Sequence, residues 1–230
     1  MGPPSATLSG GSTARRYRVG LVRVVTLADE EALNKHGKII TETFPELEVV
    51  SRCIEDQPYG IYDRESEEVA KPKVLRLVRR FEEEGFEAVI VSCAADPAVD
   101  EARRAVRIPV VGAGSAVASL ALACGRRVGV LNLTEETPEV IRRILGPHLV
   151  AEASPKGVRN TLDLLKDWGQ RAALEALKEL VERGVDVVVL GCTGYSTIEF
   201  AKRAREVVRV PVLDPVVAAG AVTLGILKQR

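Results

Sequence analysis

Long apolar runs and blocks of like charge are both missing from this 230-residue chain. No apolar run approaches the ~20 residues of a membrane-spanning helix, so we expect no membrane span. The opening stretch, MGPPSATLSGGSTARR at residues 1–16, has no apolar core. That argues against a secretory signal and favours a flexible tail or a misassigned start. We therefore expect a cytoplasmic protein whose folded part begins near Tyr17.

Charge of one sign is not in excess either, since 32 basic residues balance 32 acidic ones. A nucleic-acid-binding protein usually carries a basic face, so this composition argues against nucleic acid as a partner. With 46% hydrophobic residues, the chain can bury one large core or two smaller ones. The composition therefore indicates a globular protein whose partner is neither nucleic acid nor membrane.

Closely spaced metal ligands are also missing. The chain has four cysteines and two histidines, at Cys53, Cys93, Cys124, Cys192, His36 and His148. No two cysteines form a C-x-x-C pair and the histidines lack an H-x-x-x-H spacing, so we expect no metal site. A disulfide framework is also unfavourable in a reducing compartment. The cysteines need another explanation, which is either packing or chemistry.

Short apolar runs alternate with longer, charged stretches of helical period along the whole chain. We expect strands over residues 17–26, 48–54, 87–92, 108–111, 127–133, 149–151, 185–190 and 210–213. We expect helices over residues 30–42, 67–84, 96–105, 115–123, 161–183, 197–207 and 214–228. Continuously apolar strands that alternate with helices are typical of a parallel sheet covered on both faces. The fold class that follows is α/β.

The chain also repeats itself. The segment GFEAVIVSC ends at Cys93, and the matching segment GVDVVVLGC ends at Cys192. RIPVVGAGSAVA, which begins at Arg107, likewise matches RVPVLDPVVAA, which begins at Arg209. The repeat predicts two pseudo-symmetric, doubly wound parallel-sheet domains with the active site in the cleft between them.

The repeat places the two domains at residues 17–115 and 116–214. An apolar C-terminal segment, residues 215–230, follows them. Asp214 is expected to cap its helix, with Pro215 at the first helical position. This helix would pack across the two domains or form a subunit interface, and its apolarity favours a homo-oligomer.

Each predicted domain ends a central strand on a cysteine. A single strand-end cysteine is more often a buried packing residue than a catalytic group. Two at equivalent strand exits favour chemistry, because packing gives no reason to place the same thiol twice where the chain leaves the core. The backbone N–H groups after each cysteine are expected to lower the thiol pKa and to hold a substrate oxygen.

Two facing thiols suit a reaction that inverts a carbon centre of a small molecule. One thiolate would remove a proton from one face of a carbon acid, and the other thiol would deliver a proton to the opposite face. Neither a cofactor nor a metal is needed for this exchange. The sequence thus favours a cofactor-independent racemase with Cys93 and Cys192 as the catalytic pair.

Four motifs carry a resemblance to a known family: SCAADP at Cys93, IPVVGAGSA at residues 108–116, RVGVLNLTEET at residues 127–137 and LGCTGYS at Cys192. Together they make the chain similar to the aspartate/glutamate/hydantoin racemase superfamily from Tyr17 onward. The resemblance implies two doubly wound domains, cofactor-independent racemisation and catalytic roles for both cysteines. It also implies substrate-binding positions, which are Ala94, Ala95, Thr134, Thr137, Thr193 and Gly194.

The C-x-x-D-P and C-x-G sequences at the two cysteines look like the hydantoin and allantoin racemase branch of this superfamily. That branch usually carries an Asn-Pro-Asn turn after the first strand, where this chain has RVVT at residues 23–26. The favoured substrate is a 5-substituted hydantoin or allantoin. The alternatives are an aspartate/glutamate-type racemase, a maleate-type cis–trans isomerase, a single-cysteine decarboxylase, a redox pair and a two-lobed small-molecule binding protein.

Several other residues receive a structural interpretation. His36 is expected to be a surface or hydrogen-bonded histidine, with reach into the cleft as the alternative. Asp96 is expected to cap the helix that it begins. Cys53 and Cys124 are expected to be packing residues. The segment at residues 52–63 is either a specificity lid or a surface turn.

Overall fold

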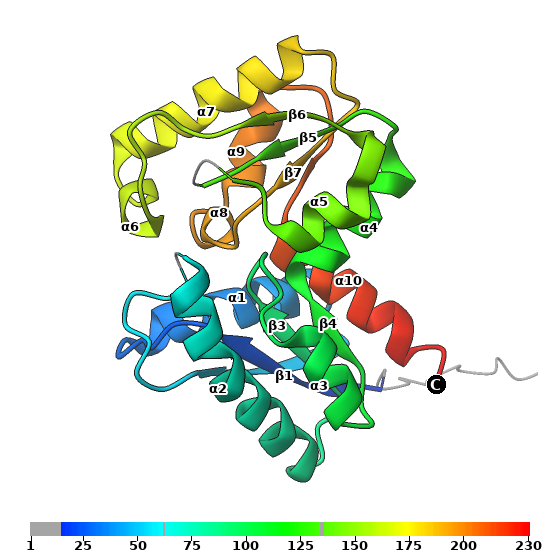
Figure 1. Ribbon diagram of the computed structural model, residues 1–230. Coiled ribbons are helices and arrows are strands. Elements are labelled where there is room, and N and C mark those ends of the chain that lie inside the picture. Colours follow the sequence, from blue (N-terminus) through cyan, green and yellow to red (C-terminus); the bar gives the residue numbers. More distant parts are fainter. Residues whose placement is uncertain (1–14, 62, 134–135) are drawn as a thin grey trace, which may run out of the picture.

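Four parallel strands with their helices form the first half of the molecule, in the lower part of Figure 1. The computed structural model describes residues 15–61, 63–133 and 136–230. The strands are β1 (Tyr17–Arg23), β2 (Leu47–Cys53), β3 (Ala88–Ser92) and β4 (Val110–Gly112). The helices are α1 (Glu30–Thr43), α2 (Arg64–Glu83) and α3 (Val99–Ala105). The sheet order is β2-β1-β3-β4.

The second half repeats this sheet. Its strands are β5 (Val128–Leu131), β6 (Leu149–Ala153), β7 (Val187–Leu190) and β8 (Val212–Leu213). Its helices are α5 (Glu139–Leu145), the short 3₁₀-helix Gly146–His148, α6 (Thr161–Leu164), α7 (Asp167–Glu182), α8 (Gly194–Thr197) and α9 (Phe200–Val207). The order β6-β5-β7-β8 is again parallel throughout. The predicted α/β class with two doubly wound parallel sheets is confirmed.

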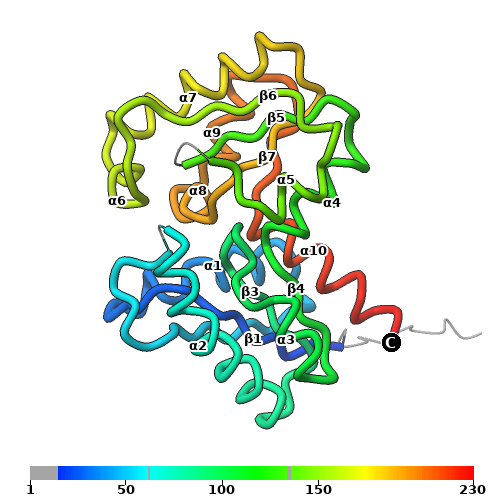
Figure 2. The backbone as a smooth tube through the Cα atoms, viewed as in Figure 1, coloured from blue at the N-terminus to red at the C-terminus, as the bar shows by residue number. Residues whose placement is uncertain are grey.

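Two further helices, α4 (Ala113–Cys124) and α10 (Pro215–Leu227), lie where the halves meet (Figure 2). Their buried side chains join one apolar core with β1, β3 and α1 of the first half and β5, β7 and α5 of the second. Separate cores lie under α2 and α3, and under α7 and α9. The two halves therefore share a core, which fixes the position of one sheet relative to the other. Among the described residues, no helix is both long and apolar enough to cross a membrane.

The central strands show why the apolar runs were informative. Every residue of β3 and of β7 is buried. A strand with helices on both faces has no solvent side, so it needs no alternation of polar and apolar residues. Both strands end within two residues of a cysteine, because the apolar run stops where the strand leaves the core.

One predicted helix is two helices in the structure. The helical period over residues 161–183 continues without a break, but the chain forms α6 and then α7. The Asn160 side chain caps α6, accepting from two backbone N–H groups. A Cβ on Gly169 would overlap the Asp163 carbonyl oxygen, so α7 passes directly against α6. This close crossing bends the chain where periodicity alone predicts continuation.

Left-handed residues account for two other differences. The helix expected from Asp96 begins only at Val99, because Asp96 and Ala98 have φ of 53° and 56°. The helix expected from Thr197 is α8 followed by α9, and Glu199 at φ 51° separates them. The C-terminal helix begins at Pro215 with Asp214 as its cap, as expected.

Candidate active site

Cys93 and Cys192 occupy equivalent places in the two sheets. Cys93 directly follows β3, and Cys192 follows β7 with Gly191 between them. Both side chains are half-buried. Each stands at the carboxyl end of a central strand, which is where open parallel sheets bind their ligands.

The two cysteine turns meet across the boundary between the halves. The Thr193 hydroxyl donates to the Ser92 carbonyl oxygen at 3.4 Å. A negative charge on Cys192 would raise the pKa of Cys93, an effect smaller than that of burial. The structure therefore brings together the two turns that carry the thiols at equivalent strand ends.

In each turn a backbone N–H group faces the sulfur of that turn's cysteine. The Gly194 N–H donates to Cys192 Sγ at 3.3 Å. The Ala95 N–H makes the corresponding bond to Cys93 and lowers the pKa of that thiol. The local geometry that sequence reasoning associates with a stabilised thiolate is thus present in both halves.

Burial nevertheless decides the protonation state. It raises the pKa of Cys93 to about 12 and the pKa of Cys192 to about 11, against the effect of these N–H groups. The prediction that helix starts lower both thiol pKa values is therefore wrong. A thiolate here loses its hydration, and one backbone N–H replaces only part of it. Both thiols are protonated at neutral pH in this conformation.

Asp96 supports the first cysteine turn from behind. Its carboxylate accepts from the Gly114 N–H at 2.7 Å and from the Ser115 N–H at 2.8 Å. It therefore caps α4 and not α3, which corrects the sequence-based prediction. A Cβ on Gly112 would collide with this carboxylate, so only glycine fits there. The bonds tie the Cys93 turn to the helix that starts the shared core.

Asp214 gives the second turn the same support from the opposite side. It stands at the position that matches Gly112 in the repeat, and it accepts from the Val216 and Val217 N–H groups. The Ser196 hydroxyl, from the turn after the second cysteine, donates to the same carboxylate at 2.8 Å. In each half a carboxylate joins the cysteine turn to a helix N-terminus, and that of Asp96 is buried.

The predicted substrate-binding residues next to the cysteines lie at the meeting of the two turns. Ala94 is buried, and its carbonyl packs against Gly114 of α4. The backbone N–H groups of Ala95 and Gly194 face the sulfurs, and the Thr193 hydroxyl reaches the other half. These four positions are thus close to the thiol pair.

The two predicted threonines differ from them. Thr134 lies outside the described residues. Thr137 is buried, and its hydroxyl bonds to the Asn132 side chain and the Glu152 carboxylate. Arg142 pairs with the same carboxylate at 2.8 Å. The structure therefore engages the Thr137 hydroxyl with two side chains of the second half, and its role in substrate binding stays a prediction.

Comparison with known proteins places this arrangement in a family. The family model for Asp/Glu/Hydantoin racemase matches residues 32–223. The chain belongs to the Asp/Glu/hydantoin racemase family. The resemblance carried by the four motifs is thereby confirmed, and at this level so is the prediction of an isomerase of the racemase type.

A curated relative supports one branch of the racemase family, and two solved structures share the fold. A hydantoin racemase of Rhizobium meliloti is 31% identical over 172 residues, covering 71% of this chain and 70% of that protein. Allantoin racemase from Klebsiella pneumoniae has a TM-score of 0.81 at 23% identity, covering 93% of this chain and 88% of that one. Allantoin racemase from Pseudomonas fluorescens has a TM-score of 0.79 at 21% identity, covering 92% and 91%. The sequence match supports the hydantoin racemase-like branch, and the structural matches support the two-domain fold.

The sequence left the position of His36 open, and the structure of this racemase-family chain defines it. It is buried at 1% exposure, on α1. Nδ1 lies 2.8 Å from Ser92 Oγ and Nε2 lies 2.9 Å from Thr197 Oγ1. Burial, Arg23 and Lys35 hold its pKa well below the ordinary value. A lone histidine in the middle of a helix carries no sequence signal for such partners.

The other two cysteines differ from each other. Cys53 ends β2 and is half-buried, and burial raises its pKa. Cys124, at the end of α4, is exposed, so its prediction as a packing residue is wrong. Arg23 replaces the first residue of the turn expected for the branch, and its guanidinium donates inward to the Ala32 and Leu33 carbonyls of α1.

The segment at residues 52–63 is anchored to the first strand exit. The Thr26 hydroxyl accepts from the Gln57 N–H, and the Thr26 N–H donates to the Gln57 carbonyl. Tyr59 at its tip is 84% exposed. These bonds indicate an ordered turn with one projecting aromatic ring, and the lid hypothesis stays a prediction.

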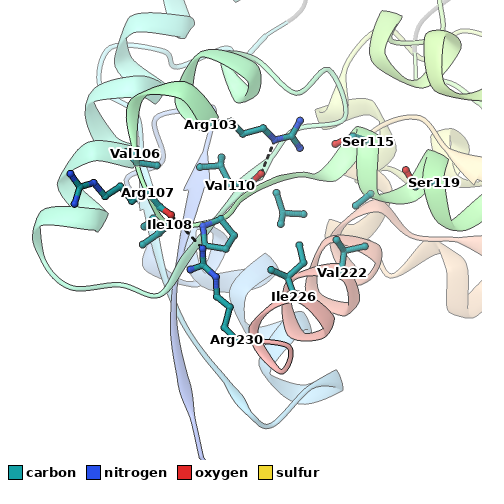
Figure 3. A pocket seen from close by; sticks show the side chains of 13 residues that line it. Arg103, Val106, Arg107, Ile108, Val110, Ser115, Ser119, Val222, Ile226 and Arg230 are labelled. Carbon is teal, nitrogen blue, oxygen red and sulfur yellow. Dashed lines mark hydrogen bonds between the residues drawn. The ribbon is translucent and has the colours of Figure 1, made fainter.

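Two cavities flank α10. One of about 410 Å³ lies between α3, β4, α4 and α10, with Arg103, Arg107 and Arg230 in its lining (Figure 3). The other, of about 420 Å³, lies between α1, α4, α9 and α10 and includes Ser196 and Asp214. Neither cavity has a cysteine in its lining, so neither is the site that the two turns form.

Proposed function

We propose that this protein is a cofactor-independent racemase in which Cys93 and Cys192 act as a two-base pair. The favoured substrate class is a 5-substituted hydantoin or allantoin. The observation that carries the proposal is the meeting of the two cysteine turns, which follow equivalent strand ends and are joined by the bond from the Thr193 hydroxyl to the Ser92 carbonyl oxygen. The sequence match to a hydantoin racemase supports the substrate class.

The proposed reaction is an exchange of two protons at one carbon. One thiolate removes the proton from C5 of the ring, and the C–H electron pair moves into the neighbouring carbonyl as an enolate. The other thiol then donates its proton to C5 from the opposite face, so that its S–H bond breaks as the new C–H bond forms. The first sulfur ends as a thiol and the second as a thiolate, ready for the reverse reaction.

The raised thiol pKa values fit this division of labour. A thiol of high pKa holds its proton until the enolate forms, and its conjugate thiolate is a strong base toward a carbon acid. Because burial sets these values, we infer that the thiolate forms while the site is open to water. The ring hydrogen of a hydantoin is more acidic than the α-hydrogen of an amino-acid carboxylate, which favours the ring substrate.

The residues beside the sulfurs would hold the substrate. We assign this role to the backbone groups of Ala94, Ala95 and Gly194 and to the Thr193 hydroxyl. Backbone N–H groups that already face each sulfur are placed to receive the developing enolate oxygen.

The expectations that concern the whole molecule belong to this proposal. We propose a cytoplasmic homo-oligomer with domains at residues 17–115 and 116–214. The apolar side chains Val222, Leu224 and Ile226 of α10 are only partly buried, which supports a contact with a second copy. Sedimentation velocity would test it: a monomer at every protein concentration contradicts the oligomer.

Solvent deuterium exchange tests the reaction and its substrate together. Single enantiomers of 5-substituted hydantoins, allantoin, aspartate and glutamate are incubated with the protein in heavy water and followed by NMR and circular dichroism. We expect exchange with loss of optical activity for a hydantoin or allantoin, and loss of both in Cys93→Ser and Cys192→Ser. Racemisation of an amino acid alone would move the assignment to the aspartate/glutamate branch, and no exchange with any compound would overturn the proposal.

A further inference from the structure

A buried histidine lies directly behind both cysteine turns, yet the proposed two-thiol exchange makes no use of it. Ser92, which bonds to His36 Nδ1 at 2.8 Å, is the residue immediately before Cys93. Thr197, which bonds to Nε2 at 2.9 Å, is the last residue of α8, the helix that follows Cys192. A single imidazole ring therefore touches both cysteine-bearing segments.

The ring spans the boundary between the halves. His36 and Ser92 belong to the first half, whereas Thr197 belongs to the second. The ion pair between Lys35 and Glu199, at 3.2 Å, crosses the same boundary, one residue from His36 and two residues from Thr197. The histidine link is the buried member of this pair of connections, because both charged side chains are about one third exposed.

The ring is held in its neutral form. Burial, together with the positive charges of Arg23 and Lys35, holds the pKa of His36 well below its ordinary value. A neutral imidazole has one N–H donor and one acceptor nitrogen, and serine and threonine hydroxyls can take either part. Both nitrogens are therefore satisfied, and loss of either hydroxyl would leave a buried nitrogen without a partner, which is unfavourable.

We propose that His36 is a positioning residue that sets the spacing and the facing of Cys93 relative to Cys192. It acts through Ser92 on one thiol and through Thr197 on the other, and it does not touch the substrate. A pair of thiols that must reach opposite faces of one carbon needs a fixed separation. A connection between the two turns supplies that, where each half by itself fixes only its own cysteine.

The chain offers matched variants that break or keep the connection. An asparagine amide reaches the place of Nδ1, and a glutamine amide reaches the place of Nε2. His36→Asn therefore keeps the bond to Ser92 and loses the bond to Thr197 across the boundary. His36→Gln keeps the bond to Thr197 and loses the bond to Ser92. Thr197→Val removes the same bond from the other side, and Thr197→Ser retains it.

The first readout does not depend on activity. In a chain with Cys53→Ser and Cys124→Ser, only the two site thiols remain, and dibromobimane becomes fluorescent when it bridges two thiols. We expect bridging to slow several-fold in His36→Asn, His36→Gln and Thr197→Val, each of which loses one of the two bonds, and to stay near the parent rate in Thr197→Ser. Equal bridging rates in all four variants, each with a cooperative thermal transition, would overturn the proposal. Where one of the disrupting variants does not fold, the others decide.

The second readout rests on the proposed racemase function. A thiolate whose partner is misplaced still removes the proton, but reprotonation from the opposite face fails, so the substrate takes up deuterium without inversion. We expect the ratio of exchange to inversion to rise in His36→Asn and Thr197→Val. We also expect kcat to fall on the order of 10- to 100-fold with little change in KM. A histidine that served only folding would leave this ratio unchanged, and that result would contradict the positioning role.

The two readouts separate the two proposals. Slower bridging in the disrupting variants, with no exchange by the parent chain on any substrate, keeps the positioning role and rejects the racemase. Racemisation by the parent chain, with an unchanged bridging rate and an unchanged ratio of exchange to inversion in the variants, keeps the racemase and rejects the positioning role.

Discussion

Replacing Gly112 by alanine should destabilise the protein through one specific collision. An ideal Cβ on Gly112 would lie 2.5 Å from Asp96 Oδ1 and closer still to the rest of that carboxylate. The carboxylate cannot move away freely, because it holds the Gly114 and Ser115 N–H groups at the start of α4. The added methyl group must therefore break the cap or displace the backbone.

The magnitude follows from these two costs. Loss of a helix N-cap costs about 0.5–2 kcal/mol, and overpacking of a buried site costs about 1–3 kcal/mol. We expect Gly112→Ala to lower the free energy of unfolding by about 2–4 kcal/mol. Urea unfolding followed by circular dichroism measures it as a shift in midpoint at constant slope.

The control and the refuting result come from the same chain. A Cβ on Gly225, in the exposed part of α10, meets nothing within 4 Å, so Gly225→Ala should be neutral or stabilising by about 0.5–1 kcal/mol. In an Asp96→Ala background the collision is gone, so adding Gly112→Ala should cost less than in the parent. An equal cost in both backgrounds would refute the proposed collision.

Three further predictions follow from burial and charge. At neutral pH iodoacetamide should modify exposed Cys124 first, with Cys93 and Cys192 reacting only as the pH rises toward about 11; peptide mass spectrometry showing equal rates would contradict the burial argument. Because both site thiols keep their protons in the folded state above pH 9, where the unfolded chain loses them, stability should fall as the pH rises from 9 toward 11. Urea midpoints of Cys93→Ser should show a flatter slope there, and an unaltered slope would exclude this thiol as the cause. Below pH 6.5 the unfolded chain protonates His36 and the folded chain does not, so the free energy of unfolding should fall as the pH is lowered. His36→Gln should weaken that fall, and an identical dependence of stability on acid pH in both proteins would contradict the reasoning.

The sheet and its repeat could be predicted because their cause is local. Apolar runs such as Ala88–Ser92 and Val187–Leu190 must lie inside a covered sheet, whatever the rest of the chain does. The break between α6 and α7 could not be predicted from the sequence, because the helical periodicity runs through Leu165 and Lys166 without interruption. The packing of Gly169 against the Asp163 carbonyl decides it, and that is a tertiary contact.

The site shows the same limit at the level of chemistry. The repeat places a thiol at each strand end, and the following backbone N–H groups are where the sequence implies. The direction of the thiol pKa shift was still wrong, because the loss of water around Cys93 and Cys192 depends on how the halves close on each other. His36 was ambiguous for the same reason, since Ser92 and Thr197 are 56 and 161 residues away in the sequence.

The supports behind the two thiols show what the pseudo-symmetry demands physically. Each half must supply an acceptor for the N–H groups of the helix that begins after its last strand. The first half places the carboxylate on the cysteine turn, as Asp96, and leaves glycine at position 112 to make room for it. The second half places the carboxylate on the strand exit, as Asp214, and the cysteine turn carries only a hydroxyl, that of Ser196. A carboxylate on both the cysteine turn and the strand exit would bring two like charges together. A carboxylate on neither would leave the helix uncapped. A single carboxylate links each cysteine turn to its helix, and it can belong to the turn, as Asp96 does, or to the strand exit, as Asp214 does. This arrangement holds both cysteine turns in equivalent places.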